Sequence, residues 1–431
     1  MNSLNYLLIF LLFHALFPVR SSAQEIVTLS YCYEKAVEAS PLQNQKLYYE
    51  SILELNRKSN ASLNYPVLGL NAQATYQSDV FSLPFDVPGV ESPIIPKNQY
   101  KVAIDFYQNI YNGGIVSNTQ AIEEAKAHIN YQGVEISNHK IREVINMLYF
   151  SVMVLQERTE LIKAMQNDIV AQHKLLQARV AEGAVLPGSA KTLQKELLTL
   201  DQKRIELEIL TQASLDLLSR WMEVPIGPDT KLVLPVFEQD PDINALPFAR
   251  PEITQFDFQI DKLASEKELI NSSRLPDIGL FGTAGMGYPN PLNWFDINFT
   301  PYYLVGMRLS WKILDYGASK RNREVLQLNQ LVVVSEKEHF IKTVEVAVTA
   351  DEADIRKYKE LIDKDRKIIS LQEDIVKQAS SQLQQGVIPG ATYITEVNKE
   401  LQVKLNLKIH EIKLAEARIN LLTETGNINE L

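Results

Sequence analysis

Histidines and carboxylates are the residues best able to do chemistry, and this sequence does not gather them into a reactive group. The six histidines are His14, His128, His139, His173, His339 and His410. None forms a close pair with a carboxylate or thiol at the spacing of a metal site, so we expect histidines that are solvated or packed on helices. No Ser/His/Asp set, phosphate loop or dinucleotide motif occurs. We therefore predict a protein that is not an enzyme, with no catalytic, cofactor or metal site.

The remaining reactive or unusual residues have structural explanations. Cys32 is the only cysteine, which excludes an intrachain disulfide, and we expect a buried or unreactive thiol. The glycines at 282, 285 and 287 lie in an expected strand, where a bend or close packing explains them better than a phosphate cradle. Asp105 and Arg308 lie on the polar faces of expected strands, where they are either simply solvated or tune permeation.

Composition describes a folded, acidic chain. It has 431 residues, a formal net charge of -10 and 45% hydrophobic residues. No basic block is present, so no nucleic acid partner is expected. Residues 1–23 resemble a secretory signal peptide, with an apolar core over 7–17 and small residues before the expected cleavage site; a buried N-terminal helix is the alternative. No later apolar run is long enough to predict a transmembrane helix.

The elements that position these residues are best seen over 302–385. Apolar and polar residues alternate through 303–312, which predicts a two-sided strand. A long helix is expected after Gly317. Along it, apolar residues recur every seven positions, as in a coiled-coil seam, at Ile355, Ile362, Ile369, Val376 and Leu383. About 70 residues at ~1.5 Å each predict a rod of roughly 100 Å.

The same elements are expected twice. The first half predicts a helix over 30–62, strands over 64–79 and from 102, a long helix from Gly114 to about 182, and a return helix to about 222. A proline-rich connector, 225–251, follows. The second half predicts a helix over 252–274, strands over 278–288 and 303–312, a long helix, and a return helix to about 425.

Landmarks support an internal duplication. Leu70 corresponds to Leu280, 210 positions later, and Val102 corresponds to Val305, 203 positions later. The glycine turns correspond at nearly the same offset. We predict a signal peptide at 1–23, a first repeat at 24–224, the connector at 225–251 and a second repeat at 252–431.

Four amphipathic strands cannot close a barrel alone, and open edges are not tolerated in lipid. Three copies would provide twelve strands. The polar strand residues Asn71, Gln73, Asp105 and Arg308 would then face the lumen, and the apolar residues would face lipid.

The duplicated plan resembles the TolC-like outer membrane factor family. The resemblance rests on Pro-x-Leu/Ile-Gly-Leu at the first strand of each half, the junction glycines Gly114 and Gly317, the glycine-containing helical turns, and the segment 311–317, WKILDYG. It implies a homotrimeric, mixed α/β membrane protein: a 12-stranded outer-membrane β-barrel continuing into a periplasmic α-helical coiled-coil tunnel. It also implies a passive exit duct for tripartite efflux or type I secretion, with a periplasmic adaptor and an inner-membrane pump as partners.

The resemblance also assigns docking turns and shows one departure. The turns that would dock the adaptor are Gly183, Ala184, Val185 and Leu186, and Gly386, Val387 and Ile388. The family's paired aspartates after the second turn are not matched, because Thr392 and Thr395 stand nearest, Glu396 is one position off, and Lys191 occupies the corresponding region of the first half. An acidic gate is therefore not predicted.

A secreted structural coiled-coil or adhesive protein without a pore is the alternative function. A plain coiled coil does not need four alternating segments, so the strands favour the duct. The sequence does not specify the cargo or the class of pump.

Overall fold

The computed structural model describes residues 26–81, 94–183, 186–237, 240, 247–293 and 296–428. The signal-peptide prediction therefore lies outside the described residues. The chain divides into two compact units. Unit 1 comprises Met1–Pro41, Ser137–Arg250 and Val344–Leu431, and unit 2 comprises Leu42–Ile136 and Pro251–Thr343. Within the described ranges, no helix is both long and apolar enough to cross a membrane.

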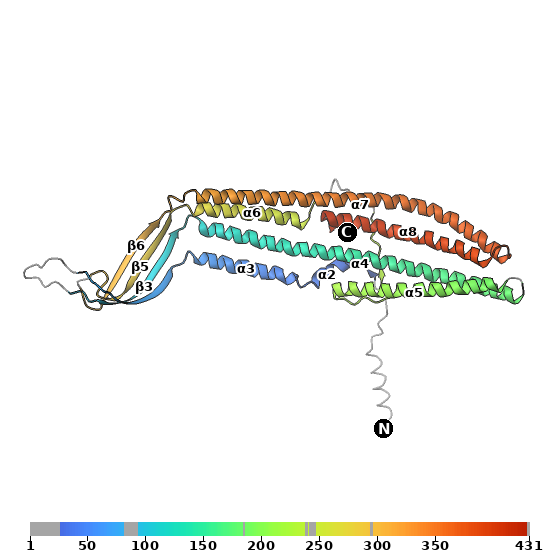
Figure 1. The fold of residues 1–431 in the computed structure, drawn as a ribbon, viewed down its shortest axis with the longest axis horizontal. Coiled ribbons are helices and arrows are strands. Elements are labelled where there is room, and N and C mark those ends of the chain that lie inside the picture. The colour runs from blue at the N-terminus through green and yellow to red at the C-terminus, as the bar shows by residue number, and fades with distance from the viewer. Residues whose placement is uncertain are drawn as a thin grey trace, which may run out of the picture. The chain divides into compact units, whose positions relative to one another are not determined.

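Unit 2 contains one twisted four-stranded sheet and the helices that lead into and out of it (Figure 1). Its complete elements are α3 (Gln43–Ser62), β2 (Val67–Tyr76), β3 (Asn98–Tyr111), α6 (Pro251–Ser272), β5 (Asp277–Tyr288) and β6 (Thr300–Ser310). It also holds the first parts of α4 (Ile115–Ala181) and α7 (Ala318–Gln384). The strand order is β2-β3-β5-β6, with every neighbouring pair antiparallel. The sheet edges are therefore β2 and β6.

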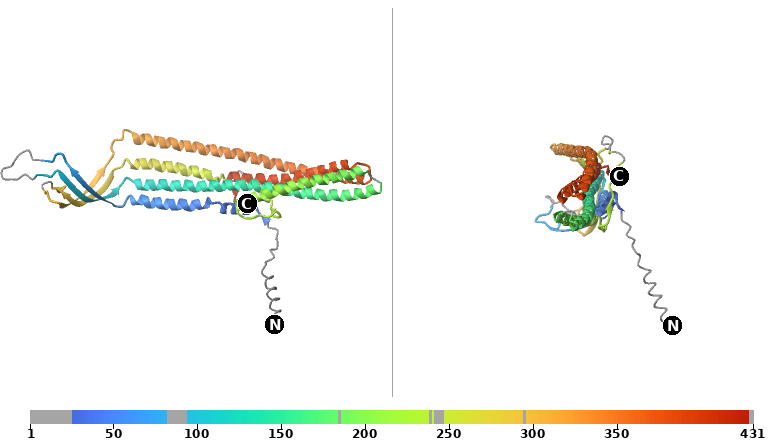
Figure 2. Two further views of the ribbon diagram at one scale, coloured as in Figure 1. Left: turned by 60° about the horizontal axis from the view of Figure 1, so that its bottom comes forward. Right: turned by 90° about the vertical axis from the view of Figure 1, so that its right-hand side faces the viewer.

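Unit 1 is helical. Its elements are β1 (Ile26–Val27), α2 (Leu29–Glu38), α5 (Pro187–Met222), β4 (Lys231–Leu232), α8 (Gly390–Thr425) and the later parts of α4 and α7. In this unit α5 returns along α4 and α8 returns along α7 (Figures 1 and 2). Apolar side chains from all four helices form one buried cluster near the turns. The expected pairs of long and return helices are present.

The seven-residue seam predicted on α7 is the buried side of that helix. Ile355 and Ile362 are each 7% exposed and Leu383 is 2% exposed. The other two seam residues, Ile369 and Val376, are half-buried, and the residues before them, Ile368 and Ile375, are exposed. Burial thus follows the heptad positions, because a helix in a supercoiled pair turns the same stripe towards its partner at every second turn.

The short strand β1 is held by its pairing with β4 and by a tyrosine of α4. The buried Tyr149 hydroxyl lies 2.6 Å from the carbonyl oxygen of Val233 and 3.0 Å from that of Val27, either of which can accept its single proton. The same hydroxyl accepts from the backbone amide of Val233 at 2.9 Å. Cys32 is fully buried in this core, where burial raises the pKa of its thiol to about 12. The expectation that the Cys32 thiol is buried is confirmed.

The first predicted helix is in fact two. The sequence predicted one run over 30–62, but α2 ends at Glu38 and α3 begins at Gln43. Pro41 has no amide to donate and disfavours the helical conformation of the residue before it. The break falls where the two units meet in the sequence.

Candidate functional site

The sheet of unit 2 carries a polar and an apolar face, as the alternation predicted. Residues directly opposite one another in an antiparallel pair share a face. Leu70 therefore shares the apolar face with Ile104, and Asn71 shares the polar face with Ala103. The apolar face presents exposed Leu68, Leu70, Val102, Ile104, Tyr303, Val305, Met307 and Leu309. Such a band exposed to water would be costly, so this face requires an apolar neighbour.

On the polar face, Asp105 is held by two neighbouring strands. Its carboxylate accepts from the Thr283 hydroxyl at 2.7 Å and from the Asn71 amide. Asp105 lies directly opposite Thr283 in the β3–β5 ladder. The carboxylate is thereby fixed at the centre of the polar face and not free to reach along the strand.

Arg308 lies on the same face, where its side chain contacts an aromatic ring. Its guanidinium carbon stands 5.1 Å from the centre of the Phe281 ring, within the range of a cation–π contact. The Phe281 ring packs over Gly306, where an added Cβ would lie 2.8 Å from the ring. The Tyr107 ring packs in the same way over Gly279, where a Cβ would meet the hydroxyl oxygen at 2.5 Å. A side chain at either glycine would therefore clash with the ring that packs over it.

The glycine cluster predicted to mark close packing does so. A Cβ at Gly285 would stand 2.2 Å from the carbonyl oxygen of Val102, a backbone atom that cannot move aside. Opposite Gly285, Tyr302 is 8% exposed, and its hydroxyl has no hydrogen-bond partner among the described residues. Gln73, the remaining residue expected on the polar face, lies opposite Lys101.

The strand–helix junctions depend on Gly114 and Gly317, which adopt φ values of +87° and +78°. These left-handed conformations favour glycine. At the second junction, the Asp315 carboxylate accepts from the amides of Gly317 at 2.9 Å and Ser319 at 3.0 Å. Hydrogen bonds from Ser319 and then Gly317 lower the pKa of Asp315 to about 2. Asn112 caps the first junction, accepting from the Gly114 amide at 3.2 Å.

The turns between long and return helices differ in how far they expose apolar side chains. Gly183 and Gly386 each have φ of +74°, which reverses the chain. Leu186 and Val387 are exposed, whereas Ile388 packs against the apolar cluster of the four helices. The other two residues of the first predicted docking turn, Ala184 and Val185, lie outside the described residues.

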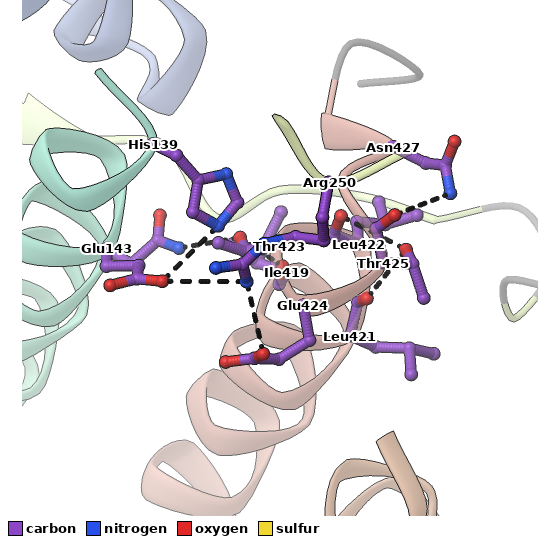
Figure 3. Close-up of polar contacts among 11 residues, drawn as sticks. His139, Glu143, Arg250, Ile419, Leu421, Leu422, Thr423, Glu424, Thr425 and Asn427 are labelled. Atoms are coloured by element: carbon purple, nitrogen blue, oxygen red, sulfur yellow. Dashed lines mark hydrogen bonds and ion pairs between the residues drawn. The ribbon is translucent and has the colours of Figure 1, made fainter. Parts of the chain in front are cut away.

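A polar cluster of unit 1, which the sequence did not predict, joins α4 and α8 to the connector (Figure 3). Buried Arg250 lies 3.3 Å from the Glu424 carboxylate and 3.8 Å from the Glu143 carboxylate. His139 Nε2 is 3.3 Å from Glu143, an ion-pair distance without hydrogen-bond alignment. Arg250 is 107 positions from Glu143 and 174 from Glu424, so no local motif indicates its ion pairs, whereas His139 and Glu143 are only four positions apart on α4.

Another contact missed from the sequence links α7 to α8. Asp365 is buried on the seam of α7, and its Oδ2 lies 2.5 Å from Nδ1 of His410. Forty-five positions separate the two residues, so spacing alone could not pair them. Glu396, one of the residues near the positions where the family has its paired aspartates, also lies between α7 and α8. Its carboxylate accepts a hydrogen bond from the Gln372 side-chain amide at 3.1 Å. Among the described residues, no three His, Cys, Asp or Glu side chains are placed to hold a metal ion.

The sequence matches no family model and no curated protein. Solved structures do match its fold. The outer membrane protein VceC of Vibrio cholerae is 14% identical, with a TM-score of 0.68 over 92% of this chain and 96% of that chain. The MtrE outer membrane channel of Neisseria gonorrhoeae is 13% identical, with a TM-score of 0.68 over 93% and 89%. The CmeC outer membrane channel of Campylobacter jejuni is 12% identical, with a TM-score of 0.66 over 93% and 86%.

Proposed function

On the premise that the chain has the fold of the TolC-like outer membrane factors, as its sequence predicted, we propose that it is a passive exit duct of the outer membrane. It would serve a tripartite efflux or type I secretion system and receive cargo from an inner-membrane pump through a periplasmic adaptor. The observation that carries the proposal is the sheet of unit 2. One of its faces is an exposed apolar band, and both of its edges lack a partner strand within the described chain.

Assembly into a trimer follows from the open edges. Unpaired strand edges are not tolerated in lipid, and four strands are too few to enclose a lumen. Three copies joined edge to edge would give a twelve-stranded barrel with lipid on the apolar face and water on the polar face. Asn71, Gln73, Asp105 and Arg308 would then line the lumen.

The helices beside the two sheet edges support the same assembly. α3 leads into β2, and it exposes Leu47, Tyr48, Ile52 and Leu55. α7 follows β6, and its first part exposes Val325, Leu328, Leu331 and Val332. Apolar residues exposed at helical spacing indicate a surface that is covered in the assembled state. Lateral contact between copies would cover both and continue the barrel into a periplasmic helical tunnel.

We also propose that the chain arose by duplication, with repeats at 24–224 and 252–431 joined by 225–251. In support, α4 and α7 each have 67 residues, and α5 and α8 each have 36. The two compact units do not correspond to the repeats, because each unit combines segments from both. Each unit thus holds corresponding segments of both repeats.

The duct is tested by fractionation and conductance. The protein should remain with outer membranes until detergent is added, run as a heat-sensitive trimer on gels, and form channels in planar lipid bilayers. Release into buffer as a soluble helical protein without conductance would instead support the structural coiled-coil alternative.

Adaptor docking at the turns needs a separate test, because Ile388 packs inward while Leu186 and Val387 do not. Replacing Leu186 and Val387 together with serine should leave the trimer intact but abolish export and crosslinking to the adaptor. Ile388→Ser is the matched comparison, since it removes a packed side chain of the same turn and should lower trimer stability. Normal export by the Leu186/Val387 variant would contradict docking at these side chains.

A further inference from the structure

We propose that Asn298 is a glycosylation site, at which an oligosaccharide is attached through the side-chain nitrogen. Asn298 lies in the loop that joins β5 to β6, at the end of the sheet away from α6 and α7 (Figure 1). The proposal goes beyond the exit duct and does not depend on it, because it requires only that this loop leaves the cytoplasm.

The sequence offers three candidate positions for such a modification. Asparagine followed two positions later by serine or threonine, with no proline between them, is the acceptor motif for N-linked sugars. The chain has this motif at Asn60, Asn271 and Asn298. A short motif also arises by chance, so the surroundings of each asparagine decide between them. The transferase must reach the side-chain nitrogen, which favours an exposed segment outside regular structure.

Two of the three asparagines are held inside helices, whose backbone hydrogen bonds keep the motif from extending into an enzyme. Asn60 is on α3, and its Nδ2 is enclosed, with no hydrogen-bond partner among the described residues. Asn271 is on α6, where its Nδ2 donates to the Glu268 carboxylate at 3.1 Å and its Oδ1 accepts from Arg323 of α7 at 3.1 Å. The fold therefore withholds both motifs from a transferase.

Asn298 differs because it is exposed and lies outside helix and strand. Its neighbour Phe299 is 50% exposed. The base of the loop is fixed by Asn290, whose backbone amide donates to the Asp296 carbonyl at 3.0 Å and whose side chain donates to the Thr300 hydroxyl at 3.0 Å. The residues between these two points are thus presented to solvent from a fixed frame.

Asp296 is placed to raise the reactivity of the Asn298 side chain. Its Oδ1 accepts from Asn298 Nδ2 at 3.0 Å and from the Asn298 backbone amide at 3.2 Å. Hydrogen bonds from the Asn298 backbone, the Asn298 side chain and the Thr300 hydroxyl, in that order, lower the pKa of Asp296, so it is an ionised acceptor at neutral pH. An amide nitrogen is a weak nucleophile because its lone pair is delocalised into the carbonyl. A carboxylate that accepts one of its protons returns electron density to the nitrogen.

The reaction needs a sugar donor with a good leaving group, of the class of oligosaccharides linked to a polyprenyl diphosphate. Nδ2 of Asn298 attacks the anomeric carbon, so that a C–N bond forms while the C–O bond to the diphosphate breaks. The diphosphate leaves with the bonding electron pair, and one Nδ2 proton passes to solvent. Nothing is oxidised or reduced in this step.

Mass spectrometry of the full chain isolated from its native host tests the site. Trypsin releases residues 275–308 as one peptide, which contains Asn298 and excludes the motifs at Asn60 and Asn271. We expect this peptide to be heavier than its sequence by the mass of an oligosaccharide, and Asn298→Gln to remove that mass completely. Asn293→Gln is the matched control, because it changes an exposed asparagine of the same loop that has no hydroxyl residue two positions later.

Two further positions separate recognition of the motif from folding of the loop. Thr300→Ser keeps the hydroxyl and should keep the sugar, whereas Thr300→Val should lose it. Asp296→Asn should lower the modified fraction several-fold. The yield of folded protein should stay unchanged in Asp296→Asn, since a merely structural role would lower the yield and not the modified fraction.

An unmodified peptide in the wild-type protein would overturn the proposal. An added mass that persists in Asn298→Gln would overturn it too, and its loss in Thr300→Val alone would assign an O-linked sugar to Thr300 instead. None of these results bears on the duct, which fractionation and conductance test separately on the same protein.

Discussion

Replacing Asp351 with asparagine should stabilise the helical unit at pH 8 and leave its stability unchanged at pH 4. Asp351 lies on α7 and lines a groove of unit 1 that also presents Glu143, Glu416 and Glu424. Burial first, then the charges of Glu424 and Asp354, raise the pKa of Asp351 from 3.8 to about 7. The carboxylate form is thus disfavoured in the folded protein.

The sign follows from which state holds the proton more tightly. The folded-state pKa lies above the unfolded one, so the folded protein is favoured by protonation. That contribution is fully present below about pH 4 and is lost as pH rises through 7. Asparagine has no carboxyl group to titrate, so the variant does not lose stability over this pH range. The difference in the free energy of unfolding between the variant and the wild type should therefore grow between pH 4 and 7 and stay constant above pH 7.

The magnitude can be bounded from the same values. A pKa difference of about three units corresponds to roughly 4 kcal/mol at about 1.4 kcal/mol per unit. Asp351 is only half-buried, so solvent screening reduces this to about 1–2 kcal/mol. We expect the apparent Tm of the variant at pH 8 to rise by a few degrees.

Helix loss on heating, followed by circular dichroism of the detergent-solubilised protein, measures the effect. The heating rate must be fixed, since unfolding of such proteins is commonly irreversible. Asp363→Asn is the matched control, because it removes an exposed carboxylate from the same helix outside the groove. Equal shifts for both variants, or a shift of the Asp351 variant at pH 4 as large as at pH 8, would refute the reasoning.

Three further predictions follow from burial, close packing and strand faces. Ile362→Asp would bury a charge on the α7 seam at a cost of roughly 3–5 kcal/mol, so trimer yield should collapse; a normal yield would show that the seam is not packed. Gly285→Ala should lower outer-membrane yield, because its Cβ would meet strand backbone, whereas Gly69→Ala, with open space beside it, should not. Cysteine at Asn71 should react with an impermeant thiol reagent and cysteine at Leu70 should react poorly; the reverse would exchange the faces.

Much of the fold was predictable because it depends on periodic, local patterns. The seven-residue spacing of Ile355 and Ile362 indicated which side of α7 is buried, and the burial follows it. Alternation through Leu70 and Asn71 separated the sheet faces before any pairing was known. Pro41, in contrast, was placed near the start of one helix, although its missing amide divides that helix in two.

The unpredicted features depend on which distant residues meet. Asp365 and His410 share no motif, and each is an ordinary helix residue until α7 and α8 are paired side by side. The ion pairs of Arg250 could not be predicted for the same reason, because Glu143 and Glu424 come from two separate helices. A pattern in one segment carries no information about such partners, so the structure was needed to find them.

The equivalence of the two hairpins has a consequence for the electric field inside the proposed duct. Asp105 and Arg308 are 203 positions apart, the offset that relates β3 to β6, so they occupy the same position in the two hairpins. Three copies would therefore set six charges of alternating sign around the lumen at one depth. The field of such a ring cancels towards the axis, unlike that of a ring of one sign, and acts only on cargo that touches the wall. A cargo passing along the axis would cross this level with little regard to its own charge.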